Sequence, residues 1–300
     1  MTERPFLALG NFDGVHRGHQ AILSAARRIA GSSPVIAVTF WPHPLTVLRP
    51  QRPPVLLMDL PDRIAGLRQA GADRVRVVEF TRRVAAWSAA DFIDLVVAPY
   101  EPKTVAVGEN FHFGHGAQAD ADSLDTLADG RFDLEIVPMV CDDGPISSSR
   151  VRRSVAAGDL MTARRLLGRS FRFSGAVVTG DRRGRTLGFP TANLVVPVGR
   201  ACPPDGVYAG YLSGGSLGAE PRPAAISVGS NPTFDGHERR VETHVIDASD
   251  LDLYGQRVHV DFSAPLRGQV RFDGAESLIR QLKEDRRAAL VALGRPVTPA

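Results

Sequence analysis

Cysteine is scarce in this chain of 300 residues, which holds only Cys141 and Cys202. Two thiols cannot build a disulfide framework, and neither of them sits in a Cys-x-x-Cys spacing. A sequence with so little cysteine is typical of a reducing compartment. We therefore expect a cytoplasmic protein whose two thiols stay reduced.

Long apolar runs are also missing. The longest of them, such as Val35–Trp41, are far shorter than the ~20 residues that a membrane-spanning helix needs. The first residues, MTERPFLALGNFDG, lack the apolar core and the cleavage site of a secretory signal peptide. The sequence therefore predicts neither export nor a membrane partner.

Lysine is nearly absent, so almost all of the 36 basic residues are arginines, and 33 acidic residues leave a formal net charge of +3. The arginines recur as scattered doublets with acidic residues between them. A nucleic-acid-binding protein usually concentrates its positive charge in a stripe or a tail. We therefore expect no nucleic-acid partner.

The first half of the chain alternates short apolar runs with helical patterns. This alternation is typical of a parallel sheet covered by helices on both faces, and the length of the chain suggests two domains. The expected strands are Phe6–Leu9, Val35–Phe40, Val75–Phe80, Thr104–Gly108 and Leu134–Val137, and the expected helices are Gln20–Ala30, Asp62–Ala70 and Ala89–Val97.

The pattern changes after Gly168. Two short helices, Ser149–Ala157 and Asp159–Leu167, come before it, and a last helix is expected over Ala275–Leu293. The segments between are short and strand-like, without intervening helices, which suggests a small antiparallel barrel or sandwich. These strands are Phe171–Val178, Val207–Leu212, Ala224–Val228, Arg240–Ile246 and Arg257–Phe262.

A glycine-rich and histidine-rich segment, GNFDGVHRGHQ, follows the first strand and opens the first helix. Gly10 and Gly14 allow a sharp turn, and a helix N-terminus offers free N–H groups to a phosphate. His16 and His19 are three residues apart, so they project to the same side of the first helical turn. These features predict a site for the phosphates of a nucleotide.

This segment resembles the adenylyltransferase half of bacterial bifunctional riboflavin kinase/FAD synthetases, and its His-x-Gly-His core resembles the nucleotidyltransferase superfamily. Pro42-His43-Pro44, Val107–Gly114 and Ile146–Arg152 continue the resemblance in the expected order. Ser149 stands where the family has Thr, which keeps the hydroxyl. The loop Gly116–Asp120 departs from the family pattern, since Ala119 precedes the acidic residue in place of glycine.

The resemblance implies an α/β fold in which residues 1–168 form a Rossmann-like nucleotidyltransferase domain that transfers AMP from ATP to FMN. It also implies that His16 and His19 contact the ATP phosphates and that Arg152 holds the leaving pyrophosphate. Further residues implied to bind the nucleotide or its phosphates are Asn11, Asp13, Gly14, Asn110, Ser148 and Ser149.

Other interpretations of these residues stay open. His16 alone could be a helix cap, and Ser147–Ser149 could cap the helix that follows, with the same N–H groups that would bind phosphate. His43, between two prolines, fits a structural role as well as a functional one. A zinc site formed by His112, His115 and the histidine pair is disfavoured, because no cysteine accompanies them.

A second motif, GDRRGRTLGFPTANL, begins at Gly180. Its three glycines, Gly180, Gly184 and Gly188, and its arginines suggest a loop that covers phosphates. Thr191 and Asn193 are two residues apart in an extended segment, so their oxygens share one face and could reach one hard cation. Mg²⁺ with few protein ligands and the phosphates of ATP is the usual arrangement.

The Gly-Phe-Pro-Thr-Ala-Asn part of this motif resembles the riboflavin kinase domain without a substitution, and later segments, such as Val241-Glu242-Thr243-His244, continue the match. The resemblance implies that residues 169–300 form a six-stranded antiparallel β-barrel with a C-terminal helix. It implies that Glu242 is the general base that accepts the proton of the riboflavin 5′-hydroxyl. A structural alternative for Glu242 is an outward-facing charge on a strand.

Together the two motifs predict a bifunctional enzyme that uses ATP and Mg²⁺ to convert riboflavin to FMN and FMN to FAD. Its partners are then these small molecules, and self-association is left open. One alternative is a riboflavin kinase with an inactive or repurposed first domain, which the changed loop Gly116–Asp120 motivates. A second is a non-catalytic flavin-binding or nucleic-acid-binding regulator, although a binding protein needs no general base.

Overall fold

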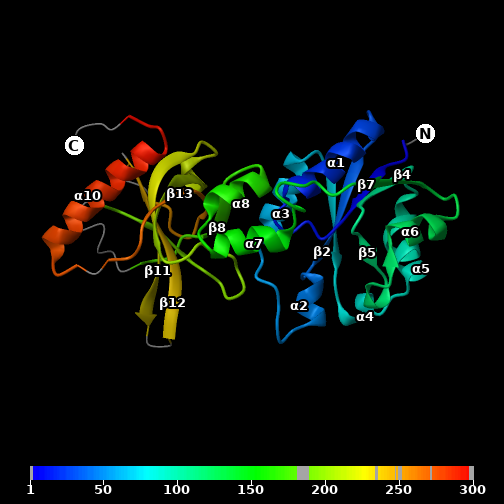
Figure 1. Ribbon diagram of the computed structural model, residues 1–300, viewed down its shortest axis with the longest axis horizontal. Coiled ribbons are helices and arrows are strands. Elements are labelled where there is room, and N and C mark those ends of the chain that lie inside the picture. Colours follow the sequence, from blue (N-terminus) through cyan, green and yellow to red (C-terminus); the bar gives the residue numbers. More distant parts are fainter. Residues whose placement is uncertain are drawn as a thin grey trace. The chain divides into compact units, whose positions relative to one another are not determined.

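The computed structural model describes residues 3–180, 189–233, 236–246, 248, 252–270 and 272–296. The chain forms two compact units, Met1–Ser148 and Ser149–Ala300, and Figure 1 labels many of their elements. Each unit has a sheet of its own: a five-stranded one in the first and a six-stranded one in the second. No helix within the described ranges combines the length and the apolar character needed to cross a membrane.

The sheet of the first unit is parallel throughout, as the alternating pattern predicts. Its strand order is β3-β2-β1-β4-β7. On the central strand, Leu7 and Leu9 pack into one apolar cluster while Phe6 and Ala8 pack into another, so both faces are buried. The strands are β1 (Phe6–Leu9), β2 (Val35–Trp41), β3 (Arg74–Glu79), β4 (Thr104–Gly108) and β7 (Asp133–Val137).

Helices of different lengths connect the strands of this sheet. The expected helix at Gln20–Ala30 begins three residues earlier, at Arg17, and the expected helix at Ala89–Val97 changes into a π-helical segment at Ile93. The helical elements of this unit are α1 (Arg17–Ala30), α2 (Pro44–Leu48), α3 (Leu60–Gln69), α4 (Arg82–Ala85), α5 (Ala89–Phe92), η1 (Ile93–Val97), η2 (Ala98–Tyr100), η3 (His115–Ala117) and α6 (Ala121–Ala128).

A small hairpin forms at the loop where the sequence departs from the family pattern. Strand β5 (His112–Phe113) pairs with β6 (Ala119–Asp120), so Ala119 lies opposite Phe113. Asp120 then caps α6, because its carboxylate accepts hydrogen bonds from the N–H and the hydroxyl of Ser123. These hydrogen bonds lower the pKa of the Asp120 carboxyl. The loop Gly116–Asp120 therefore ends in a paired strand and in the N-terminal cap of α6.

Two helices join the units along the chain, at the positions expected from the sequence. Helix α7 (Ser148–Ala156) contains the division between the compact units, and α8 (Leu160–Leu167) follows it. Asp159 caps α8 by accepting from the Thr162 N–H, and Gly168 ends it with a φ of 73°, a conformation that favours glycine.

The second unit is a nearly closed antiparallel barrel, as expected. Its strand order is β8-β13-β10-β11-β12-β9, and the end strands meet where the Val178 N–H donates to the Asn193 carbonyl at 2.8 Å. Strand β9 was not expected from the sequence. The strands are β8 (Phe171–Ala176), β9 (Ala192–Val195), β10 (Gly206–Gly214), β11 (Arg222–Thr233), β12 (Gly236–Val245) and β13 (Arg257–Arg267), with the short helix η4 (Gly215–Leu217) after β10.

The last helix, α10 (Ala275–Ala292), packs against the barrel, close to its expected range. Its Ala289 and Leu290 share a buried apolar cluster with Ala209 and Ile246. Arg267, at the end of β13, donates two hydrogen bonds of 2.7 and 2.6 Å to the Asp285 carboxylate of this helix. A planar guanidinium matches a carboxylate in this two-point geometry, so the pair fixes α10 to the strand.

Candidate active sites

The loop between β1 and α1 has an unusual backbone. Phe12, Gly14 and Val15 have positive φ values of 55°, 88° and 39°. Only glycine adopts such values at little cost, so buried Phe12 and Val15 store local strain. Gly10 is required by crowding, because a Cβ there would lie 2.9 Å from the Phe12 ring. The sequence of the motif therefore fits a tight and strained turn.

The two histidines of the motif lie together, as their spacing predicts. Their rings stack with centroids 3.6 Å apart and planes inclined by 16°. His16 is buried and caps α1, because its Nδ1 accepts from the His19 N–H. His19 is half-buried, and the edge of the Phe12 ring supports it at 5.2 Å. His16 therefore caps the helix and is at the same time one of the two stacked histidines.

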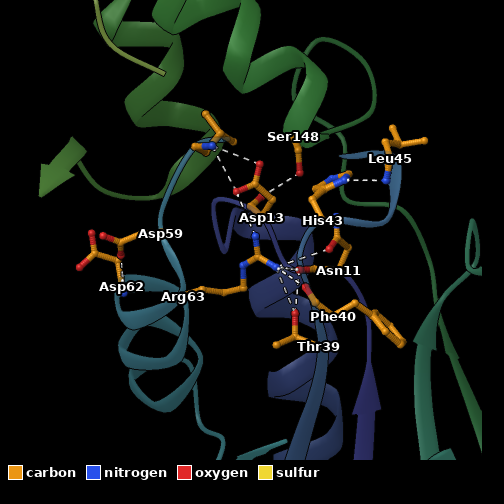
Figure 2. Close-up of polar contacts among 11 residues, drawn as sticks. Asn11, Asp13, Thr39, Phe40, His43, Leu45, Asp59, Asp62, Arg63 and Ser148 are labelled. Atoms are coloured by element: carbon orange, nitrogen blue, oxygen red, sulfur yellow. Dashed lines mark hydrogen bonds and ion pairs between the residues drawn. The ribbon is translucent and has the colours of Figure 1, made fainter. Parts of the chain in front are cut away.

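Asp13, a residue of the same loop, is buried, and Figure 2 shows its side chain near that of Arg63. Its carboxylate accepts from the Leu57 N–H and forms an ion pair of 3.6 Å with Arg63. Both side chains of this pair are 0% exposed. The Asp13 carbonyl accepts from the Ser148 hydroxyl at 2.8 Å. Asp13 therefore holds the turn in place through contacts of its side chain and of its carbonyl.

A cavity of about 600 Å³ opens beside this loop. It lies at the carboxyl ends of β1 and β4, where the chain order of a parallel sheet reverses and ligands usually bind. Asn11, His19 and Asn110 form a polar part of its wall, together with the glycines Gly10 and Gly108. The structure therefore brings three predicted nucleotide-binding residues to one cavity.

The rest of the cavity wall is mostly apolar, and several aromatic rings form part of it. The ring centroids of Phe40 and Phe80 lie 6.1 Å apart, and those of Phe92 and Phe113 lie 5.2 Å apart. Such a wall suits a flat apolar ring. The aromatic residues that line the cavity are Phe40, Phe80, Trp87, Phe92, Phe111 and Phe113, and only Phe111 and Phe113 lie in a segment that the sequence singles out.

Two further histidines of the first unit, His43 and His112, have partners of their own. His43 is buried and caps α2, because its Nδ1 accepts from the Leu45 N–H at 3.1 Å. His112 is exposed, and its Nδ1 lies 3.0 Å from the Asn110 carbonyl. In the part of the chain that the structure describes, no three His, Cys, Asp or Glu side chains form a group that could hold a metal.

The first turn of α7 carries the serines and the arginine of the Ile146–Arg152 segment. Ser148 reaches the Asp13 carbonyl, as above, while Ser149 is exposed and Arg152 is half-buried. Arg152 belongs to the second compact unit. Its contact with the pyrophosphate stays a prediction, as does the nucleotide contact of Ser149.

In the barrel, Thr191 and Asn193 lie on one face, as their spacing predicts. The Asn193 amide nitrogen donates to the Thr191 hydroxyl at 3.1 Å. Asn193 is only 7% exposed, and a Cβ on Gly180 would lie 2.7 Å from its amide. Gly180 is therefore required by this close approach. Gly184 and Gly188 lie outside the described residues.

Glu242 lies directly opposite Asn193 in the pairing of β12 with β9, and opposite Ser227 in the pairing of β12 with β11. Paired residues share a face, so these three side chains form a row across three strands. The alternate residues Val241 and Thr243 are fully buried inside the barrel. The Glu242 row is therefore on the outside, where the predicted metal ligand Asn193 is its neighbour.

Gln269, which the sequence did not single out, borders the same row. Its amide nitrogen donates to the Ser227 hydroxyl at 3.1 Å and to the Val228 carbonyl at 2.8 Å. The segment after β13 thus lies against β11 next to Glu242. On the other side His244 is held by the Pro190 carbonyl at 2.9 Å. These contacts enclose the row between two loops.

Comparisons with known proteins agree with the division of the chain into two different halves. A family model described as FAD synthetase matches residues 1–150, and one described as riboflavin kinase matches residues 167–293. A bifunctional riboflavin kinase/FMN adenylyltransferase of Escherichia coli (strain K12) is 39% identical over 285 residues, covering 93% of this chain and 90% of its own. A protein of the same name from Bacillus subtilis (strain 168) is 32% identical, covering 95% and 91%.

A solved structure from Streptococcus pneumoniae, described as a macrolide-efflux protein, has a TM-score of 0.85 and 32% sequence identity, and it covers 96% of this chain and 94% of its own. Its likeness supports the two-unit fold along nearly the whole chain. The family models and the relatives agree on the two halves in the same order. This chain belongs to the bifunctional riboflavin kinase/FMN adenylyltransferase family.

Proposed function

We propose that this chain makes FAD from riboflavin in two ATP-dependent steps, one in each half. The barrel half phosphorylates riboflavin to FMN, and the parallel-sheet half transfers AMP to FMN. The observation that carries the proposal is that each half gathers a polar set of its own: Asn11, His19 and Asn110 around one cavity, and Asn193 beside Glu242 on one face of the barrel. We place the functional division at residues 168 and 169, between α8 and β8.

In the kinase step, Glu242 accepts the proton of the riboflavin 5′-hydroxyl. The freed oxygen attacks the γ-phosphorus of ATP, a new P–O bond forms, and the bond to ADP breaks. A positioned general base contributes about 10²- to 10⁴-fold in rate. The pairing of Glu242 with Asn193 supports this assignment, because it holds the base next to the residue proposed to bind the cation of ATP.

Thr191 and Asn193 would hold Mg²⁺. Both offer the hard oxygen ligands that this ion prefers, and ATP oxygens and water would complete its shell. The Asn193 nitrogen faces the Thr191 hydroxyl, and a rotation of the amide would bring its oxygen to the same point. When bound, the ion neutralises negative charge on the phosphates. The chain supplies the two ligands and the close cover at Gly180.

In the adenylyl transfer, an oxygen of the FMN phosphate attacks the α-phosphorus of ATP, and the bond to pyrophosphate breaks. No covalent enzyme intermediate is needed, so positioning and charge stabilisation dominate. We assign His16 and His19 to the ATP phosphates, Asn11 and Asn110 to the nucleotide, and Arg152 to the leaving pyrophosphate. Asp13 and Gly14 shape the turn, while Ser148 and Ser149 contribute hydroxyls at the start of α7.

The aromatic part of the cavity is the place that we propose for the isoalloxazine ring of FMN. The ring is flat and largely apolar, and the cavity joins an aromatic wall to the polar residues of the nucleotide site. This assignment puts the FMN phosphate toward the His19 end of the cavity.

The free state of both cysteines supports a cytoplasmic location.

The two steps can be separated by substitution. We expect Glu242→Gln to abolish FMN formation from riboflavin and to spare FAD formation from supplied FMN. We expect His19→Ala to do the opposite. Chromatography that resolves riboflavin, FMN and FAD over time measures both reactions in the same sample. Exposed Glu284 and His115 offer matched controls, Glu284→Gln and His115→Ala, which should leave both reactions intact. A folded variant that lost both activities through one of the two site substitutions would contradict the two-site proposal.

A further inference from the structure

Arg63 is a charged side chain that lies wholly inside the first unit. It comes from α3, is 0% exposed, and is the largest of the fully buried side chains. Figure 2 shows its guanidinium directed at the loop that follows β1. Burying a guanidinium is costly unless the group is paired and hydrogen-bonded. The contacts of Arg63 with carbonyl and carboxylate groups therefore offset the cost of burying its charge.

These contacts join three segments that are distant in the sequence. Nη1 donates to the Asn11 carbonyl at 2.9 Å and to the Phe40 carbonyl at 3.1 Å. Nη2 faces the Asp13 carboxylate at 3.6 Å, and the guanidinium lies 5.2 Å from the centre of the Trp41 ring. The nucleotide loop is thus tied to the end of β2 through one side chain.

The contact with Asn11 fixes the direction of a peptide group in the loop. The Asn11 carbonyl accepts from Arg63 and, at 2.9 Å, from the Thr39 hydroxyl. Because the peptide is trans, the N–H of Phe12 points the opposite way, away from Arg63. A neighbouring carbonyl, that of Asp13, is held in turn by Ser148. Two carbonyls of the loop are therefore anchored.

Such anchoring is needed because the loop is strained. Phe12 and Val15 have positive φ values, which persist only where surrounding contacts impose them. Arg63 and its partner Asp13 supply contacts at the start of this stretch. Without them, the turn would relax toward common backbone angles and would carry the cavity-lining residues Asn11 and His19 with it.

We propose that Arg63 is a positioning residue for adenylyl transfer. It touches no substrate; it holds the loop in the conformation that presents Asn11 and His19 to the phosphates of ATP. This inference rests on the proposed function of the first unit. From the sequence alone, Arg63 has the pattern of an exposed charged residue on a helix.

The test compares three variants of the full chain. Arg63→Met removes the charge and the donors, and Arg63→Lys keeps the charge but loses the planar fork that reaches several acceptors. Leu67→Ala is the matched control for packing alone: Leu67 lies one turn further along α3, is fully buried and shares an apolar cluster with Phe12 and Val15, but its apolar side chain makes no hydrogen bond to the loop. For each variant, Tm, FAD formation from FMN and FMN formation from riboflavin are measured.

For Arg63→Met we expect kcat/KM for ATP in FAD formation to fall about 10- to 100-fold, the scale of a small displacement of reacting groups. KM for FMN should change little, because the aromatic wall stays in place. Arg63→Lys should recover part of the loss. Leu67→Ala should lower Tm, and at a temperature where the chain is folded it should lower kcat/KM for ATP much less than Arg63→Met does. Riboflavin phosphorylation by the barrel should be the same in all three variants.

Several results would overturn the proposal. An Arg63→Met variant with full FAD formation would show that the loop does not need the guanidinium. Equal losses of FAD formation in Arg63→Met and Leu67→Ala would show that Arg63 contributes only to the overall stability of the unit. If Arg63→Met does not fold, Arg63→Lys decides, and a Lys variant with unchanged kinetics overturns the proposal. If the unsubstituted chain makes FMN but no FAD, the proposed function of the first unit fails instead, and the inference fails with it.

Discussion

His16 and His19 belong to one short motif, yet their surroundings differ. His16 is buried and accepts a backbone hydrogen bond at the start of α1, while His19 lines the cavity. Their stacked rings mean that a change to either one disturbs the other. Loss of His19 removes a cavity group, whereas loss of His16 also removes a helix cap, which typically costs about 1 kcal/mol. His19 is therefore the cleaner site for substitution.

The two cysteines should differ sharply in reactivity. Burial raises the pKa of the Cys202 thiol to about 12, while Cys141 is exposed. The thiolate is the reactive form, so Cys202 stays protonated and inert at neutral pH. We expect a thiol reagent such as DTNB to titrate one thiol per folded chain and two thiols in guanidinium chloride.

The control is Cys141→Ser, which should leave no rapidly reacting thiol in the folded protein. Rapid modification of this variant without denaturant would show that the barrel opens around Cys202 far more easily than its burial implies.

Some residues of the candidate sites could be predicted from the sequence, and others could not. The motif residues Asn11, His19 and Asn110 could be found because their local pattern carries the chemistry. Arg63 could not, because one arginine in a helical segment has the pattern of a solvated charge, and its burial depends on β1, β2 and the Leu57 segment folding around it. Gln269 was missed for the same reason, since its hydrogen bond with Ser227 joins two residues that are 42 positions apart in the sequence.

At the scale of elements, α8 depends on its N-terminal cap. The Asp159 carboxylate accepts from the Thr162 N–H, and this hydrogen bond lowers the pKa of Asp159. We expect Asp159→Ala to lower the free energy of unfolding by about 1 kcal/mol at neutral pH. Thermal unfolding followed by circular dichroism measures the difference.

The same cap has a defined pH dependence. Because the pKa of Asp159 is lower in the folded state, its stabilisation is present above the unfolded pKa of about 3.9 and is lost as the pH falls through the folded value. The difference in Tm between the unsubstituted chain and Asp159→Ala should therefore shrink in acid. Asp159→Asn, which caps without a charge, should show little of this dependence. A constant difference at all pH values would contradict the role of the carboxylate.

The elements themselves were largely predictable. All five strands of the parallel sheet and the long helices α1 and α10 follow their hydrophobic patterns to within a few residues. Strand β9 was missed because Ala192–Val195 is only four residues long and its partner, β12, lies far along the chain. Helix α2 was missed because Pro44–Leu48 is a single turn that depends on the His43 cap. The pairing of Glu242 with Asn193 is likewise a matter of register, which the sequence pattern alone does not define.

At the scale of the whole molecule, the two proposed steps use separate residues, and FMN is the product of one step and a substrate of the other. A mixture of Glu242→Gln chains and His19→Ala chains should therefore convert riboflavin to FAD, although neither variant does so alone. The His19→Ala barrel supplies FMN, and the Glu242→Gln chain adenylylates it. Product analysis after mixing measures this complementation, and FAD should appear after a lag that shortens as the His19→Ala concentration rises.

Absence of FAD in the mixture, with both single activities intact, would show that FMN does not leave the barrel in a form that another chain can use. The control is a mixture in which FMN is added from outside, since the Glu242→Gln chain should then form FAD without a lag.

The central place of β1 in its sheet affects the order in which the chain can fold during synthesis. Phe6 pairs with Val35 on one side and with Thr104 on the other, so β1 is synthesised before its second partner, which lies 98 residues further along the chain. At about 5–20 residues per second, translation takes roughly 5–20 s to supply that partner. During this interval one edge of the apolar strand β1 stays without its neighbour in the nascent chain.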